Sequence, residues 1–175
     1  MKNIIIIGFT STGKSSVGAA LAQATGRAFV DLDRELEIEH QRRSGRVESC
    51  RSIFESYGEM YFSVCEFTSL EKRLVDSNQV IATGGHAALC SSCRDLLVHD
   101  MNHVVYLTAT PEVIFSRMQA KGIPAYMKND PTLAAVQKFV ATRDPLYTQL
   151  AHVTLDVSTR TIEESVQELK RLLHL

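Results

Sequence analysis

A glycine-rich stretch near the N-terminus constrains the fold more than any other part of the chain. Residues 8–15 read GFTSTGKS and fit the pattern G-x-x-x-x-G-K-[ST] of a phosphate-binding loop. The β-branched run Asn3–Ile7 precedes the loop, and a segment with helical spacing, residues 15–25, follows it and stops at Gly26. Because loop N–H groups and a helix N-terminus together attract phosphate, this order of strand, loop and helix predicts binding of a nucleoside triphosphate.

The residue types in the loop predict what each part contacts. Lys14 is expected to reach the β- and γ-phosphates, and the Ser15 hydroxyl is expected to be a ligand of Mg²⁺. The predicted nucleotide contacts in this part of the chain are Gly8, Thr10, Ser11, Thr12, Gly13, Lys14, Ser15 and Ser16.

The rest of the chain alternates between short apolar runs and helical patterns. Further buried strands are predicted over residues 27–33, 79–83, 104–107 and 153–155. A last helix is predicted from the capping box Thr161–Glu164, with Ile162, Val166 and Leu173 among its buried residues. This alternation predicts one α/β domain over residues 1–175, with a parallel sheet that helices cover on both faces.

Polar residues and glycines follow two of these strands. Asp31 and Asp33 are two residues apart, so on a strand they would share a face. At the carboxyl edge of the sheet they would hold Mg²⁺ through water or accept a proton from an attacking hydroxyl. The alternative is that they cap a following helix. Gly84 and Gly85 would let the backbone approach a ligand closely.

Charge and cysteine content exclude several classes of protein. The formal net charge of −1 argues against binding to nucleic acid or a membrane surface, which would usually need a basic face. No stretch approaches the roughly 20 apolar residues of a spanning helix, and the N-terminal apolar run is too short for a signal peptide. We therefore expect a cytoplasmic protein. Cys90 and Cys93 leave zinc, redox and ordinary-thiol interpretations open, and the lack of a second metal-binding pair favours ordinary thiols.

Several stretches together resemble the shikimate kinase family, which has the P-loop fold of the nucleoside-monophosphate-kinase-like group. They are the phosphate-binding loop, Asp31-Leu-Asp33, Gly58-Glu59 with Phe62, Gly84-Gly85 and residues 143–147 (RDPLY). The resemblance covers nearly the whole chain and implies a strand order of 2-3-1-4-5. It also implies an enzyme that uses ATP and Mg²⁺ to convert shikimate to shikimate 3-phosphate, in aromatic amino-acid biosynthesis.

The resemblance also implies residue roles. Asp31 would help to position Mg²⁺, and Asp33 would bind the shikimate hydroxyls as the candidate base. Arg143 would hold the shikimate carboxylate, while Gly84 and Gly85 would line the substrate site. Arg117 would lie over the adenine and Arg160 in the adenine-binding loop. A substrate-binding segment would span about 34–62, and a lid would span about 121–132.

Three positions depart from the family pattern. Ser63 and Ile123 stand where the family carries arginines that act on the substrate carboxylate and on the transferred phosphate, and His86 replaces a glycine. Lys121 or Lys128 is a candidate to replace the lid arginine. For the carboxylate, the candidates are four arginines of an insert-like segment: Arg42, Arg43, Arg46 and Arg51.

These departures leave two alternatives to shikimate phosphorylation. One is a kinase that acts on another small hydroxy acid or sugar acid. The other is a catalytically weak nucleotide-binding module. In each case we expect a monomer.

Overall fold

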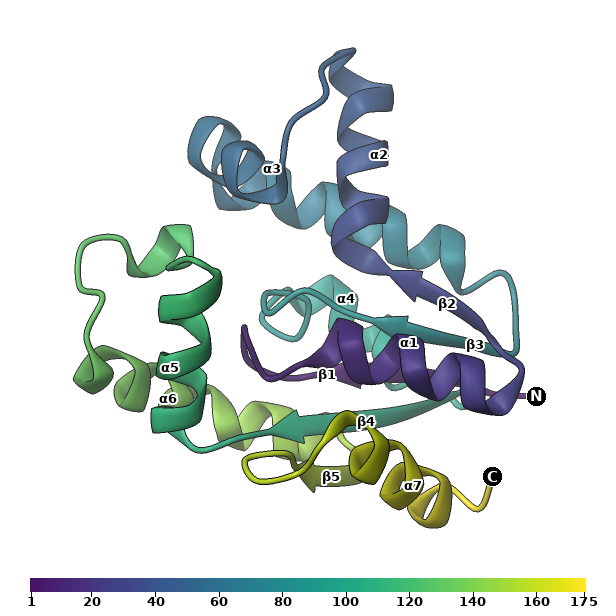
Figure 1. Ribbon diagram of the computed structural model, residues 1–175. Helices are drawn as coiled ribbons and strands as arrows, with labels where there is room; N and C mark the ends of the chain where they lie inside the picture. Colours follow the sequence, from purple (N-terminus) through teal and green to yellow (C-terminus); the bar gives the residue numbers. More distant parts are fainter.

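A five-stranded parallel sheet forms the centre of the computed structural model, which describes residues 1–175 (Figure 1). Its strands are β1 (Asn3–Ile7), β2 (Ala28–Asp31), β3 (Gln79–Ala82), β4 (Asn102–Thr108) and β5 (Val153–Asp156). All four strand pairs are parallel, and the order is β2-β3-β1-β4-β5. The α/β class, the parallel sheet and the expected strand order are therefore confirmed.

Seven α-helices and one short 3₁₀ helix connect the strands. They are α1 (Lys14–Thr25), α2 (Leu32–Ser44), α3 (Cys50–Arg73), α4 (Ser91–Leu97), α5 (Pro111–Lys121), η1 (Ala125–Met127), α6 (Leu133–Leu150) and α7 (Ile162–Leu172). Helices α1 and α7 pack together on one face, and α4 and α6 lie on the other (Figure 1). None of these helices has the length and apolarity needed to cross a bilayer.

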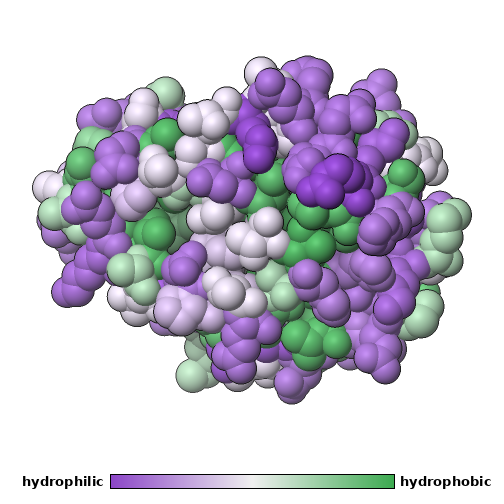
Figure 2. Space-filling view, turned by 90° about the horizontal axis from the view of Figure 1, so that it is seen from below, coloured by the Kyte–Doolittle hydropathy of each residue, from purple (hydrophilic) through white to green (hydrophobic).

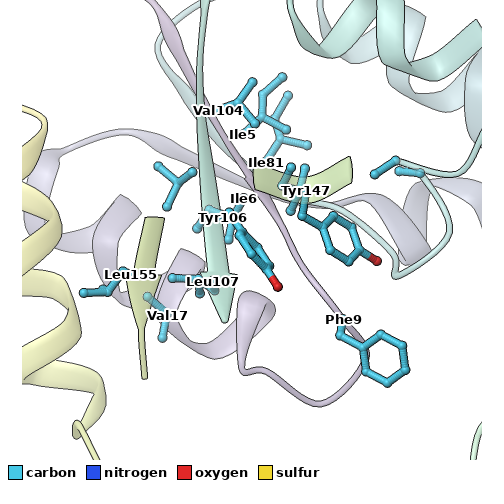
Figure 3. Packing of buried hydrophobic residues seen from close by; sticks show 14 of the residues in the cluster. Ile5, Ile6, Phe9, Val17, Ile81, Val104, Tyr106, Leu107, Tyr147 and Leu155 are labelled. Atoms are coloured by element: carbon cyan, nitrogen blue, oxygen red, sulfur yellow. The ribbon is translucent and has the colours of Figure 1, made fainter. Parts of the chain in front are cut away.

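Strand β1 lies at the middle of the core because it pairs with β3 on one side and β4 on the other. All of its residues are buried, which explains the continuous isoleucine run in place of an alternating pattern. On the α6 side, the rings of Tyr106 and Tyr147 stack with centroids 5.0 Å apart (Figure 3). These residues belong to a single cluster of 34 buried apolar side chains, so one core holds the sheet and its helices together.

Local signals set several helix ends. Gly26 has the left-handed conformation (φ 64°) at the end of α1. The side chain of Thr161 accepts a hydrogen bond from the Glu164 N–H, and the Glu164 carboxylate accepts one from the Thr161 N–H, which completes the predicted capping box. The expectation for Ile162 was wrong: this first residue of α7 is 41% exposed, whereas Val166 and Leu173 are buried. Ile162 instead lines a cavity between the phosphate-binding loop and α7.

The prediction of a strand over residues 27–33 was also wrong at its end. Strand β2 stops at Asp31 and α2 starts at Leu32, because the Asp31 carboxylate accepts a hydrogen bond from the Asp33 N–H (3.1 Å) and caps the helix. Asp33 therefore lies in the first turn of α2, and the two aspartates do not share a strand face. The capping alternative considered for Asp31 is the one observed.

Helices α2 and α3 form an arm beside the sheet (Figure 1) with a small core of its own. Leu36, Ile53, Phe62 and Cys65 make up this core. Inside α3 the backbone of Gly58 leaves the helical conformation (φ 79°, ψ 173°), and the helix kinks there. The arm contains residues 34–62, where the substrate-binding segment is predicted, and continues beyond them to Arg73.

The surface on the β5 and α7 side is covered mostly by hydrophilic residues with small apolar patches between them (Figure 2). The residues predicted to contact ligands lie instead at the carboxyl ends of the strands, where the segments after β1, β2 and β3 meet.

Candidate active site

The loop after β1 has the backbone that its glycines permit. Gly8 has φ 145°, and a Cβ placed there would overlap the backbone carbonyl of Leu107. The Lys14 ammonium donates hydrogen bonds to the carbonyls of Gly8 (2.9 Å) and Phe9 (2.8 Å), which holds its charge over the loop. The loop is thus formed with its lysine in place.

A polar cavity of about 300 Å³ opens in front of this loop. No hydrophobic residue lines it, as expected for a site that takes a polyanion. Its walls are Thr10, Ser11, Gly13, Lys14, Ser15, Ser16, Asp33, Thr83, Gly85, Lys121 and Gly122.

Two charged groups in the polar cavity have shifted acidities. Burial lowers the pKa of Lys14 to about 8, although Asp33 and Asp31 oppose this effect. The pKa of Asp33 is raised to about 6. Desolvation of the carboxyl by the surrounding protein disfavours its charged form more than the positive charge of Lys14 favours it. Asp33 is still open to the solvent that fills the cavity. An aspartate with this pKa can accept a proton near neutral pH.

The donor atoms near the loop fit Mg²⁺. The Ser15 hydroxyl and the Asp33 carboxylate line the polar cavity, and such hard oxygen donors suit a small divalent cation. Asp31, the carboxylate expected to help position the ion, does not line this cavity and uses Oδ1 to cap α2.

A second cavity of about 220 Å³ continues from the loop toward β5 and α7. It brings together Ser11, Thr12, Ser16, Arg117 and Arg160, which were expected to contact the nucleotide. The Arg117 guanidinium donates to the carbonyls of Thr12 and Val157 (both 3.3 Å) and so joins α5 to the loop and to the end of β5.

A third cavity of about 430 Å³ lies between the loop, the α2–α3 arm and the segment after α5. Asp33, Gly84, Gly85 and Arg143 line it, so the structure brings together all four residues expected at the substrate site. Below, we call it the acceptor cavity. Its glycines are needed for space: a Cβ on Gly84 would overlap Asp33 Oδ1, and a Cβ on Gly85 would lie 2.7 Å from Thr10 Oγ1.

Arg143 enters the acceptor cavity from α6, which runs through the RDPLY motif and contains Pro145. Its guanidinium lies 4.8–5.2 Å from the ring centroids of Phe9, Tyr126 and Phe139. None of the ten salt bridges involves Arg143. Aromatic rings thus orient a cation that has no carboxylate partner, as expected for a group that binds an anionic ligand.

The structure separates the candidates for the missing arginines. Arg42 and Arg43 both bind Glu39, whereas Arg51 lines the acceptor cavity and donates to the Ile123 carbonyl (3.2 Å). Arg46 and Lys128 are exposed and line none of the three cavities.

Lys121 lines all three cavities. Ser63 lines none of them, so the position of the expected carboxylate arginine does not face the acceptor cavity directly. Cys90 and Cys93 are free thiols away from these cavities.

Sequence reasoning missed other residues of the acceptor cavity. His86 was noted only as a departure, but its ring contacts the carboxylates of Glu66 and Glu59 at the cavity wall. The Tyr126 hydroxyl donates to Thr10 Oγ1 (3.2 Å) and ties the segment after α5 to the phosphate-binding loop. These partners are distant along the chain, so no local pattern signals the contacts.

Comparisons with known proteins agree with this geometry. The family model of shikimate kinase matches residues 10–174. The shikimate kinase of Symbiobacterium thermophilum is 35% identical over 170 residues, which cover 95% of this chain and 93% of that protein. The shikimate kinase of Caldanaerobacter subterraneus is 35% identical over 172 residues, which cover 98% of this chain and 95% of that protein.

Among solved structures, shikimate kinase from Acinetobacter baumannii in complex with shikimate superposes with a TM-score of 0.87 at 30% identity. The alignment covers 99% of this chain and 93% of that one. With the phosphate-binding loop, the strand order and the acceptor cavity, these matches show that the chain is a small-molecule kinase that belongs to the shikimate kinase family.

Proposed function

We propose that this protein transfers the γ-phosphoryl group of ATP to a hydroxyl of shikimate, in the presence of Mg²⁺, and forms shikimate 3-phosphate. One observation carries the proposal: the polar cavity at the loop and the acceptor cavity share Thr10, Asp33, Gly85, Lys121 and Gly122. A phosphate in one cavity and a hydroxyl in the other would therefore meet at Asp33.

Asp33 is the proposed base in this arrangement. With its pKa near 6, it is mainly a carboxylate at neutral pH and takes the proton of the acceptor hydroxyl as the oxygen attacks the phosphorus. Lys14 and the loop N–H groups hold the β- and γ-phosphates in line with this oxygen. Ser15 would hold Mg²⁺ directly and the Asp31 and Asp33 carboxylates would hold it through water, and the ion would neutralise charge on the phosphates.

The remaining charges place the acceptor and close the site. Arg143 is proposed to bind the shikimate carboxylate, since its planar guanidinium can donate two parallel hydrogen bonds. Lys121, at the junction of the three cavities, is proposed to supply the positive charge that Ile123 lacks. Arg117 and Arg160 are proposed to contact the adenine end of the nucleotide.

The test is an ADP-release assay with Mg-ATP and a panel of hydroxy acids and sugar acids, shikimate first. We expect the highest kcat/KM with shikimate and a product identified by mass as shikimate phosphate. Lys14→Ala should abolish turnover, whereas Lys128→Ala, outside the three cavities, should leave it unchanged. A higher kcat/KM with another acid would reassign the acceptor. Tight binding of ATP without turnover of any acid would indicate a nucleotide-binding module instead.

A further inference from the structure

His86 is held in a fixed orientation at the wall of the acceptor cavity. Its Nδ1 lies 2.9 Å from Glu66 Oε2, and only 17% of its side chain is exposed. The ring packs edge-on against Phe62, with centroids 5.6 Å apart, and against Phe54 at 6.5 Å. These contacts leave Nε2 as the atom of the ring that is open to an exchangeable partner.

The buried carboxylate of Glu66 favours the positively charged form of His86. The Glu66 side chain is 1% exposed and its Oε1 has no hydrogen-bond partner, so its carboxylate depends on His86 for compensation. Burial works to lower the pKa of His86, but the hydrogen bonds and charges of Glu66 and Glu59 outweigh burial and raise this pKa. The imidazolium form can donate from both ring nitrogens, one to each carboxylate.

The second partner of His86 is weakly held. Glu59 Oε1 lies 3.2 Å from Nε2, and the Glu59 side chain is 71% exposed. It follows the kink at Gly58, lines the acceptor cavity and has no other ion-pair or hydrogen-bond partner. Because solvent screens such exposed pairs, a carboxylate that arrives with a bound substrate can replace Glu59 with little loss.

We propose that the carboxylate of the acceptor takes the place of Glu59 on the Nε2–H of His86. His86 is then a specificity residue that binds the carboxylate together with Arg143, and Glu59 competes for the same contact when the cavity is empty. This inference rests on the proposed function, because it needs an acceptor that carries a carboxylate. It would also give the carboxylate a second cationic partner in a chain that has a serine at position 63.

The charges around His86 make the proposal testable by pH. The titratable and charged groups that face it or share its cavity are Cys50, Arg51, Glu59 and Glu66 of α3, Asp33 of α2, Lys121 of α5, Tyr126 of η1 and Arg143 of α6. Loss of the His86 proton raises the KM for shikimate as the pH rises through the raised pKa of His86. Asp33 acts in the opposite sense, because activity that needs its carboxylate is lost on the acid side.

The experiment compares four proteins over a pH series, with KM and kcat for shikimate at saturating Mg-ATP: wild type, Glu59→Gln, His86→Gln and Glu71→Gln. Glu71 is an exposed glutamate of the same helix outside the cavities, so its variant controls for the loss of one negative charge. Glu59→Gln should lower KM about threefold, the scale of an exposed ion pair. Glu71→Gln should leave KM unchanged.

His86→Gln keeps a donor for Glu66 but removes the charge. It should raise KM about tenfold, as expected for the loss of a charge-assisted hydrogen bond, with kcat within about threefold of wild type. The alkaline rise in KM should disappear in this variant alone. If His86→Gln does not fold, as judged by its melting curve, the Glu59→Gln KM and the wild-type pH profile decide.

Two results would overturn the inference while the proposed function stands: an unchanged KM in Glu59→Gln, or an alkaline rise that persists in folded His86→Gln. Absence of shikimate turnover by the wild type would overturn both.

Discussion

The acidity of Asp33 gives a prediction that pH alone can test. If Asp33 is the base, the acceptor can be activated only by the carboxylate form, so kcat/KM for shikimate must fall as the pH drops through the pKa of this group. Burial raises that pKa from the ordinary 3.8 to about 6, and the charges of Asp31, Glu66 and Glu37 act in the same direction. The fall of kcat/KM on the acid side of the pH profile should therefore be centred near pH 6.

The size of the effect follows from this value. With a pKa of about 6, roughly 91% of Asp33 is ionised at pH 7 and roughly 9% at pH 5, so kcat/KM should fall about tenfold between them. An aspartate with the ordinary pKa of 3.8 would lose less than about 10% over the same range.

Two measurements check the prediction. The first is kcat/KM for shikimate at half-unit steps from pH 5 to pH 9, with the nucleotide kept saturating and the fold monitored by circular dichroism. The second is the carbon-13 chemical shift of the Asp33 carboxyl in the protein without ligands, assigned with Asp33→Asn. Because Lys14 lowers the pKa of Asp33, Lys14→Met should raise the NMR value further.

An Asp33 carboxyl that titrates near pH 4, together with flat activity between pH 5 and pH 7, would refute the reasoning. It would mean that the water in the open cavity stabilises the Asp33 carboxylate enough to cancel the effect of the surrounding protein. Unchanged kcat in Asp33→Asn would remove Asp33 from the role of base altogether.

Three further predictions concern the cations of the site. Lys121→Ala should lower kcat at least tenfold with a smaller change in acceptor KM, since its charge acts on the transferred phosphate, and Lys128→Ala should match wild type in the same assay. Arg143→Met should raise the shikimate KM at least about tenfold with little change in melting temperature, because the methionine keeps the aromatic packing and loses the charge-assisted bonds. A normal KM in that variant would place the carboxylate elsewhere. Arg51→Ala should raise KM several-fold by releasing the Ile123 carbonyl, while Arg46→Ala stays within twofold; equal effects of the two would count against a lid contact.

Much of the fold could be predicted because its signals are local. The isoleucine run of β1, the glycines of the loop and the start of α1 lie within about twenty residues and specify one supersecondary unit. The capping box of α7 is a local signal too. The residues of the second cavity, between the loop and α7, followed from this unit, together with the family resemblance that indicated Arg117 and Arg160.

The prediction that Asp33 lies at the site was correct, but the predicted strand geometry behind it was wrong. Asp31 and Asp33 were expected on one strand face. Instead, the Asp31 side chain caps α2, which starts at Leu32. Strand propensity and capping compete over these few residues, and the balance depends on where the sheet ends. The tertiary structure decided that Asp33 faces the cavity from a helix.

The sequence by itself therefore determined the strands and the phosphate-binding loop, and its resemblance to the family added the strand order and the shared residues at the acceptor cavity. Only the tertiary structure decided which of several cations face that cavity. Arg51 and Arg46 are five residues apart with the same charge, yet only Arg51 reaches the segment after α5, at the Ile123 carbonyl. His86 meets Glu66 across 20 residues, because α3 passes beside the end of β3. The physical reason is that a charge gains its role from its partners and its burial, and these depend on how distant helices pack.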